Sequence, residues 1–169
     1  MAALVQTLIG ICLFQKGPQD VPYAPQTLIA AIALSAVVTF IGAGNLPETG
    51  AVGLKVGVAT AFSLAFLYAV LALRGLQARF VQSATALFGT DVLIGLPIVA
   101  LTFPIAAQGP EQAPAASAGI LLLWGWHLAI IGHVFRHTLD IRLGWGLLLA
   151  LAYALLSFQV VELAGGAAG

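Results

Sequence analysis

Two side chains capable of acid–base chemistry lie within apolar stretches of this 169-residue sequence. Asp91 belongs to the apolar stretch from Gln82 to Pro104, and His127 belongs to the next one. An ionisable side chain inside a membrane helix is costly, so it is a functional-site hypothesis by default. A carboxylate beside an imidazole can relay a proton or hold a substrate amine. The same pair can also be a clamp between two helices, with no chemical role.

The two side chains are expected at nearly the same depth. Asp91 lies about eight residues, or roughly 12 Å, from one end of its helix, and His127 lies about nine residues from the same end of the next. Helices joined by a short turn are antiparallel neighbours, so an Asp91–His127 pair is geometrically feasible. Two alternatives stay open: a protonated Asp91 bonded to a backbone carbonyl, and a cleft that admits water.

Prolines interrupt the second half of the Asp91 helix. Pro97 removes one intrahelical hydrogen bond and frees a carbonyl about one turn from Asp91. At about 100° per residue, Asp91 shares one helix face with Gly95 and Thr102. A kinked helix that carries an acid, a glycine and a freed carbonyl could line a cavity. The sequence therefore predicts Gly95, Pro97 and Thr102 as a kink or cavity face.

The composition is that of a membrane protein. Hydrophobic residues make up 61% of the chain and charged residues 7%, whereas about a quarter of an ordinary soluble domain is charged. The mean hydropathy is +1.06. The formal net charge of zero gives no support for nucleic-acid binding, and the one cysteine, Cys12, excludes an internal disulfide.

The elements expected from this pattern form an all-α, polytopic membrane helix bundle in a single domain, residues 1–169. A short apolar helix over residues 3–15 comes first, and it is too short to cross about 30 Å of hydrocarbon. We expect it to lie in the membrane interface or, alternatively, to pack on the bundle. Five transmembrane helices should follow, over about residues 26–46, 51–74, 82–107, 117–135 and 143–163.

Small residues predict faces for helix–helix packing. Ala31, Ser35 and Thr39 recur every four residues in the first span, and Gly53 and Gly57 form a GxxxG in the second. Small side chains allow helix backbones to approach closely in lipid. Both faces are therefore predicted as helix contacts.

The basic residues predict the orientation. Five of the six Lys and Arg residues fall on the side of the N-terminal segment, and Lys55 is alone on the other. Cytoplasmic loops carry the excess of Lys and Arg, so we expect a cytoplasmic N-terminus and an external C-terminus in a bacterial cytoplasmic membrane. His133 and His137 lie near the membrane edge and are expected to be ordinary surface histidines.

Enzyme signatures are missing from the sequence. There is no HExxH, no GxSxG with partner residues and no phosphate-binding glycine loop. The sequence therefore predicts a protein without catalytic activity, cofactor or metal.

The closing segment HVFRHTLDIRLGWGLLLALAYALLS, residues 133–157, is similar to the last two helices of Yip1-type membrane proteins. Five spans and short loops also resemble that family and its small prokaryotic relatives. The resemblance implies a scaffold or accessory role.

The leading functional hypothesis is an integral membrane scaffold, assembly factor or accessory subunit of a larger membrane complex. Its expected partners are the lipid bilayer and either other membrane subunits or further copies of the chain, and no nucleic acid. The alternative is a small transporter or proton-linked channel that uses Asp91 and His127.

Overall fold

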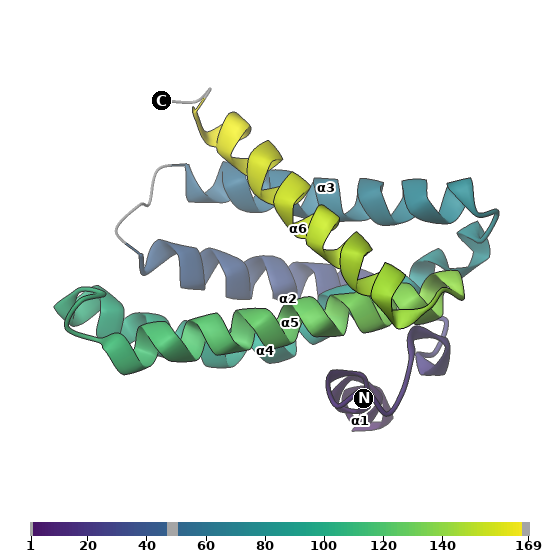
Figure 1. Ribbon diagram of the computed structural model, residues 1–169, viewed down its shortest axis with the longest axis horizontal. Helices are drawn as coiled ribbons and strands as arrows, with labels where there is room; N and C mark the ends of the chain where they lie inside the picture. Colours follow the sequence, from purple (N-terminus) through teal and green to yellow (C-terminus); the bar gives the residue numbers. More distant parts are fainter. Residues whose placement is uncertain (1, 47–50, 167–169) are drawn as a thin grey trace.

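The structure is a computed structural model that describes residues 2–46 and 51–166. Residues 1, 47–50 and 167–169 of the predicted 1–169 domain lie outside the described residues. The described part is all-helical, as predicted, and five of its helices are long and apolar enough to cross a membrane. The helices are α1 (Ala2–Cys12), α2 (Pro25–Gly44), α3 (Val52–Leu73), α4 (Phe80–Gln108), α5 (Pro114–Leu139) and α6 (Leu143–Gly166), with short 3-10 turns η1 (Pro18–Asp20) and η2 (Gln77–Arg79) (Figure 1).

The five long helices define two ends of the bundle (Figure 1). One end, here called the α1 end, holds α1 and the α3–α4 and α5–α6 connections. The opposite end, here called the far end, holds the α4–α5 turn and the end of α6. The short helix α1 runs across the spans rather than along them. Helix α6 starts beside α5 at the α1 end and diverges from it toward the far end.

Several helix ends differ from the predicted ones. Helix α1 stops at Cys12 rather than at residue 15, and α4 is longer at both ends than the predicted 82–107. Helix α5 was predicted to end at residue 135, before the polar run that follows, but it continues to Leu139. It continues because Thr138 and Leu139 are buried in the bundle. Asp140, which has a φ of 52°, then ends it in the left-handed region.

Helix α4 is the central helix at the α1 end. All eight residues from Ser83 to Thr90 are buried, and most of them are small, which lets neighbouring helices approach on every side. The buried hydroxyls of Thr85 and Thr90 donate to carbonyls of their own helix, at 2.7 Å for Val81 and 2.9 Å for Ala86. These polar side chains are therefore satisfied inside the helix.

The largest apolar cluster fills the space around this segment. Phe135 of α5 is fully buried, as is Leu71 of α3, and both belong to one cluster with Leu87 of α4. The bundle between the two ends of this segment is consequently filled by buried side chains. A second cavity, of about 330 Å³, lies at the α1 end between η1, the start of α4 and the end of α5.

The end of α1 and the turn after it are bonded to α5 through two backbone carbonyls. Trp126 Nε1 donates to the Cys12 carbonyl at 3.0 Å, and His133 Nε2 lies 2.9 Å from the Lys16 carbonyl. His133 is only 4% exposed, so its assignment as a surface histidine was wrong. The reason is that the turn after α1 folds over the end of α5 and covers the imidazole.

Helix α1 packs on the bundle, as the second expectation for it had it, whereas its place in the membrane interface stays a prediction. Leu8 and Ile11 are buried against the bundle, whereas Val5 and Ile9 are each 45% exposed. The helix therefore packs on the protein with one face and presents a second apolar face outward.

Candidate functional site: a polar group at the floor of a membrane cavity

A cavity of about 510 Å³ lies in the half of the bundle toward the far end. All five long helices contribute to its wall. Its polar side chains are Ser35 and Thr39 of α2, Thr60 and Ser63 of α3, Asp91 and Thr102 of α4, His127 of α5, and Tyr153 and Ser157 of α6. The rest of the wall is mainly apolar, with Phe88, Trp124 and Phe158 as its large aromatic side chains.

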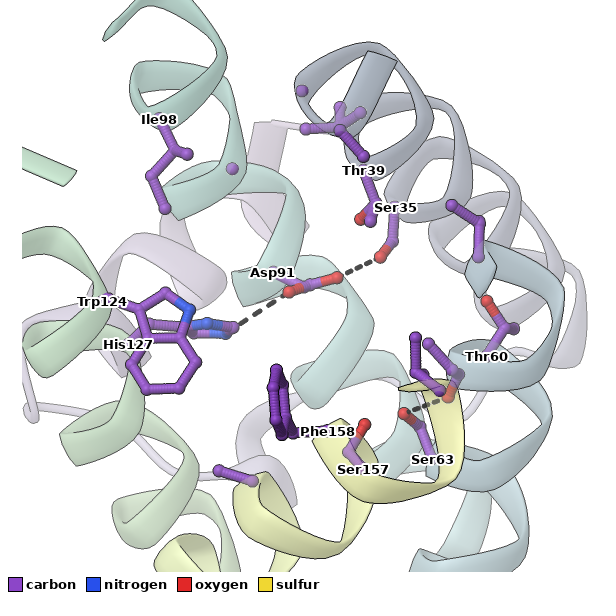
Figure 2. A pocket seen from close by; sticks show the side chains of 18 of the residues that line it. Ser35, Thr39, Thr60, Ser63, Asp91, Ile98, Trp124, His127, Ser157 and Phe158 are labelled. Carbon is purple, nitrogen blue, oxygen red and sulfur yellow. Dashed lines mark hydrogen bonds and ion pairs between the residues drawn. The ribbon is translucent and has the colours of Figure 1, made fainter. Parts of the chain in front are cut away.

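Asp91 lies between two polar neighbours from different helices (Figure 2). Its Oδ2 accepts a hydrogen bond from the Ser35 hydroxyl of α2. Its Oδ1 lies 3.4 Å from His127 Nε2 of α5. The Asp91 side chain keeps 34% of its surface exposed, so these two contacts leave part of the carboxylate open to the cavity.

The His127 imidazole is more enclosed than Asp91 and less well bonded. Its side chain is 18% exposed, and Nε2 is a buried atom without a hydrogen-bond partner among the described residues. The 3.4 Å separation is an ion-pair distance, but the orientation does not make a hydrogen bond. This atom therefore has hydrogen-bonding capacity that a ligand, a water molecule or a small movement of Asp91 would use.

Glycines set the positions of α2 and α4 around Asp91. A Cβ on Gly95 would lie 2.7 Å from Val38 Cγ1, and one on Gly42 would lie 3.3 Å from Val99 Cγ2. The two helices approach closely at both points because glycine carries no side chain. That close approach brings Ser35 within reach of the Asp91 carboxylate.

A second polar pair joins α3 to α6 in the same cavity. The Tyr153 and Ser63 hydroxyls lie 2.6 Å apart, and Ser63 also donates to the Ala59 carbonyl at 2.7 Å. Because a hydroxyl has one proton to donate, Tyr153 is the donor to Ser63. Figure 2 shows Ser63 and Ser157 facing the space that Asp91 borders.

Two further contacts hold the far end of the bundle. Asn45 Nδ2 donates to Thr102 Oγ1 at 2.9 Å, between α2 and α4. Lys55 Nζ lies 3.2 Å from Glu162 Oε1, between α3 and α6. Both pairs lie beyond the Asp91 level, toward the far end.

The structure brings together some of the residues singled out from the sequence and separates others. Ser35, Thr39, Gly95 and Thr102 line the cavity together with Asp91 and His127. Pro97 is exposed and is not part of the cavity wall, and α4 continues through it as a helix.

The remaining small residues have different surroundings. Ala31 packs against the main apolar cluster. Gly53 and Gly57 are exposed, and a Cβ on Gly57 would meet no atom within 4 Å.

Sequence reasoning missed Ser63, Tyr153 and Trp124 as cavity residues. Ser63 and Tyr153 are polar residues in the interiors of apolar helices, which is the signal that singled out Asp91. The same comparison of depths applied to hydroxyl side chains would have found the pair. Nothing in the sequence separates Trp124 from Trp126, although one lines the cavity and the other bonds to α1.

Fold and site together define a multi-pass helical membrane protein with a carboxylate and an imidazole at the floor of a largely apolar cavity. Comparisons of the chain with family models, with curated proteins and with solved structures give no match. Among the described residues, no three His, Cys, Asp or Glu side chains are grouped as metal ligands would be. The side chains present can exchange protons and accept or donate hydrogen bonds to a bound molecule.

Proposed function

We propose that this protein is a small membrane transporter whose substrate site is the cavity and whose proton-carrying group is the Asp91–His127 pair. The observation that carries the proposal is the exposure of Asp91: a carboxylate that only clamps helices needs no cavity beside it, yet the Asp91 side chain borders the cavity and keeps 34% of its surface exposed. Acidic and imidazole side chains inside membrane proteins recur in proton relays and substrate pathways.

The packing supports access from one side. The buried segment Ser83–Thr90, together with Phe135 and Leu71, fills the bundle between the cavity and the α1 end. On the other side, α6 diverges from α5 toward the far end (Figure 1). The proposal takes the cavity to be reached from the far end, which is one of the two states that alternating access requires.

The proposal includes an orientation. Lys16, Arg74, Arg79, Arg136 and Arg142 belong to the α1 end, and Lys55 to the opposite half. By the positive-inside bias, the α1 end faces the cytoplasm of a bacterial cell, and the cavity opens away from it. Reporter fusions at the C-terminus, one active only outside the cytoplasm and one fluorescent only inside, test this orientation.

The functional test measures proton movement in vesicles. Purified protein is reconstituted into vesicles that contain a protein-free extract of small molecules from the host cells. A pH-sensitive dye trapped inside the vesicles reports proton movement. We expect the protein to move protons faster than empty vesicles do. The Asp91→Asn and His127→Gln variants should lose this proton movement, and the Glu111→Gln variant should keep it. Glu111 is the matched acid control because it is exposed outside the cavity. Unchanged proton movement in Asp91→Asn, with an intact fold, would contradict the proposal.

A second candidate is the scaffold, assembly factor or accessory subunit. It is favoured by the outward face of α3, where Gly53, Gly57, Ala61, Ala65 and Ala69 recur every four residues and are all exposed. Such a face suits close contact with another membrane helix, from a partner subunit or from a second copy. The likeness to Yip1-type proteins is compatible with this candidate and stays a proposal from the sequence.

Co-purification in mild detergent separates the two candidates. The scaffold role predicts a stable complex that Gly57→Leu disrupts and Gly44→Leu does not, since Gly44 is also an open helix glycine but lies on α2. A monomer without a co-purifying protein would contradict the scaffold role and leave the transporter unaffected. Neither candidate requires a catalytic step or a cofactor, and we propose none.

A further inference from the structure

The ligand class of the cavity can be inferred from its charges, and the inference rests on the proposed transport function. Asp91 is the one acidic residue in the wall, and no Lys or Arg of the described residues lines it. The Lys and Arg residues of the described part lie toward the two ends of the bundle. Lys55 is already paired with Glu162 there, and Arg79 with Asp140. An anionic ligand would therefore meet a carboxylate and no permanent cation.

The carboxylate has room for one further partner. Ser35 donates one hydrogen bond to it, and His127 does not complete a second. A buried carboxylate gains most from a charge-assisted contact, because the low dielectric strengthens the attraction. The open part of Asp91 faces the cavity, so a cation bound there would occupy the cavity itself.

The other walls suit an apolar body. Four aromatic side chains line the cavity: Phe88, Trp124, Tyr153 and Phe158. Aromatic faces attract organic cations as well as apolar groups. The cavity volume of about 510 Å³ lies within the range of about 300–1,000 Å³ that holds drug-sized ligands. A hydrated metal ion would leave this apolar wall uncovered.

We infer that the cavity binds a hydrophobic organic monocation, whose charge contacts Asp91 and whose apolar body lies among these aromatic side chains. A proton on the Asp91–His127 pair and the organic cation compete for the same carboxylate. When the pair carries a proton, binding of the cation displaces it to water: the O–H or N–H bond of the pair breaks, an O–H bond to water forms, and no bond of the cation changes. In a transporter this competition exchanges one cation for one proton.

The test uses probes of nearly equal shape and different charge. Tetraphenylphosphonium is the cation, tetraphenylborate the anion and tetraphenylsilane the neutral probe. Saturable binding is measured on protein in lipid nanodiscs, with empty nanodiscs subtracted to remove partition into lipid. We expect the cation to bind at least tenfold more tightly than the neutral probe, and the anion to bind more weakly still.

Substitutions and the pH dependence of binding test whether Asp91 causes the preference for the cation. Asp91→Asn should weaken tetraphenylphosphonium binding at least tenfold and leave the neutral probe unchanged, while Glu111→Gln should leave both unchanged. Cation binding should weaken as the pH falls, and it should release protons into a weakly buffered sample.

The outcomes separate this inference from the proposed function. Equal binding of all three probes, or preference for the anion, overturns the cation class and leaves a ligand-binding cavity. No saturable binding of any probe overturns both the ligand class and the cavity as a substrate site. A cation preference that persists in Asp91→Asn overturns the role of Asp91 alone.

Discussion

Asp91 and its neighbours show how the protein holds an acid within an apolar helix. An unpaired carboxylate at membrane depth is strongly disfavoured. Here the acid accepts from Ser35 on one side and faces His127 Nε2 at 3.4 Å on the other. The two partners come from different helices, α2 and α5, so the acid also ties these helices to α4. The contacts that accommodate the acid therefore also hold three helices together.

Ser35→Ala should destabilise the bundle by about 0.5–1.5 kcal/mol, the range for one hydrogen bond in membrane or water. The substitution removes the hydroxyl that donates to Asp91 and leaves the backbone unchanged. Unfolding in increasing SDS, followed by circular dichroism, measures the change. Ser157→Ala is the control: Ser157 lines the same cavity without a side-chain hydrogen bond among the described residues. Equal destabilisation by both variants would mean that the Ser35–Asp91 bond adds nothing.

Cys12 reports on the docking of α1. Burial raises the pKa of the Cys12 thiol from 9.0 to about 11. A raised pKa lowers the thiolate fraction at any pH below it, so alkylation slows by roughly 100-fold near neutral pH. The rate of iodoacetamide labelling should keep rising to about pH 11 in the folded protein and should level off near pH 9 after unfolding in SDS. Mass spectrometry gives a clean readout because the chain has one cysteine.

Trp126→Phe should speed this labelling, because it removes the indole donor to the Cys12 carbonyl. Trp145→Phe is the matched control, since Trp145 is 66% exposed. A labelling rate that both substitutions leave unchanged would show that the Trp126 bond does not hold α1 in place.

At the scale of elements, glycines decide how closely the helices approach. The crossing of α5 and α6 is the tightest example: a Cβ on Gly146 would collide with the Gly132 carbonyl oxygen and press on the Arg136 backbone. Both contacts involve backbone, which cannot move aside without shifting a helix. The crossing lies near the α1 end, and α6 diverges from it toward the far end (Figure 1). Glycine at 146 thus allows the divergence that leaves space for the cavity.

Gly146→Ala should therefore destabilise the protein by about 1–3 kcal/mol, the usual cost of overpacking. Gly144→Ala, two residues earlier in the same helix, should be neutral or slightly stabilising. A Cβ there meets no atom within 4 Å, and alanine is the better helix former. Thermal unfolding of both variants in the same detergent makes the comparison. Similar melting temperatures would contradict the backbone collision.

At the scale of the whole molecule, the bundle has a half whose middle is filled by buried side chains, here called the solid half, and a half that holds the larger cavity, here called the open half. The solid half holds α1 and the buried Ser83–Thr90 segment, and the open half holds the cavity. Figure 1 shows α6 diverging from α5 toward the far end, the part of the bundle whose residues line the cavity. The Lys55–Glu162 pair, at 3.2 Å, is the ion pair that links α3 to α6 in this half.

Cysteine accessibility tests this division. In a Cys12→Ser background, a charged maleimide added to sealed vesicles should label Thr39→Cys and Ser157→Cys from one side only. Both positions line the cavity. Thr85→Cys should stay unlabelled from either side, because Thr85 is fully buried in the solid half. Labelling of Thr85→Cys in a folded sample would contradict a bundle closed at the α1 end.

The sequence by itself determined the class of structure and the place of its acid. Hydropathy along the chain distinguishes segments that suit lipid from segments that suit water. The five long helices and the short first one therefore follow from the distribution of apolar residues. Their ends were predicted less well, as in α5, where tertiary burial carries the helix to Leu139. Counting residues along two antiparallel helices placed Asp91 and His127 at the same depth. In the structure His127 Nε2 lies 3.4 Å from Asp91 Oδ1.

Only the tertiary structure decided which face of each helix is buried. A membrane helix is apolar on all sides, because lipid and protein interior are equally apolar, so periodicity does not mark the packed face. The sequence therefore did not show that Pro97 faces outward, that His133 is covered by the turn after α1, or that Tyr153 meets Ser63. Nor did the sequence show that α6 diverges from α5 beyond a close crossing at Gly132 and Gly146, next to the helices that enclose the cavity.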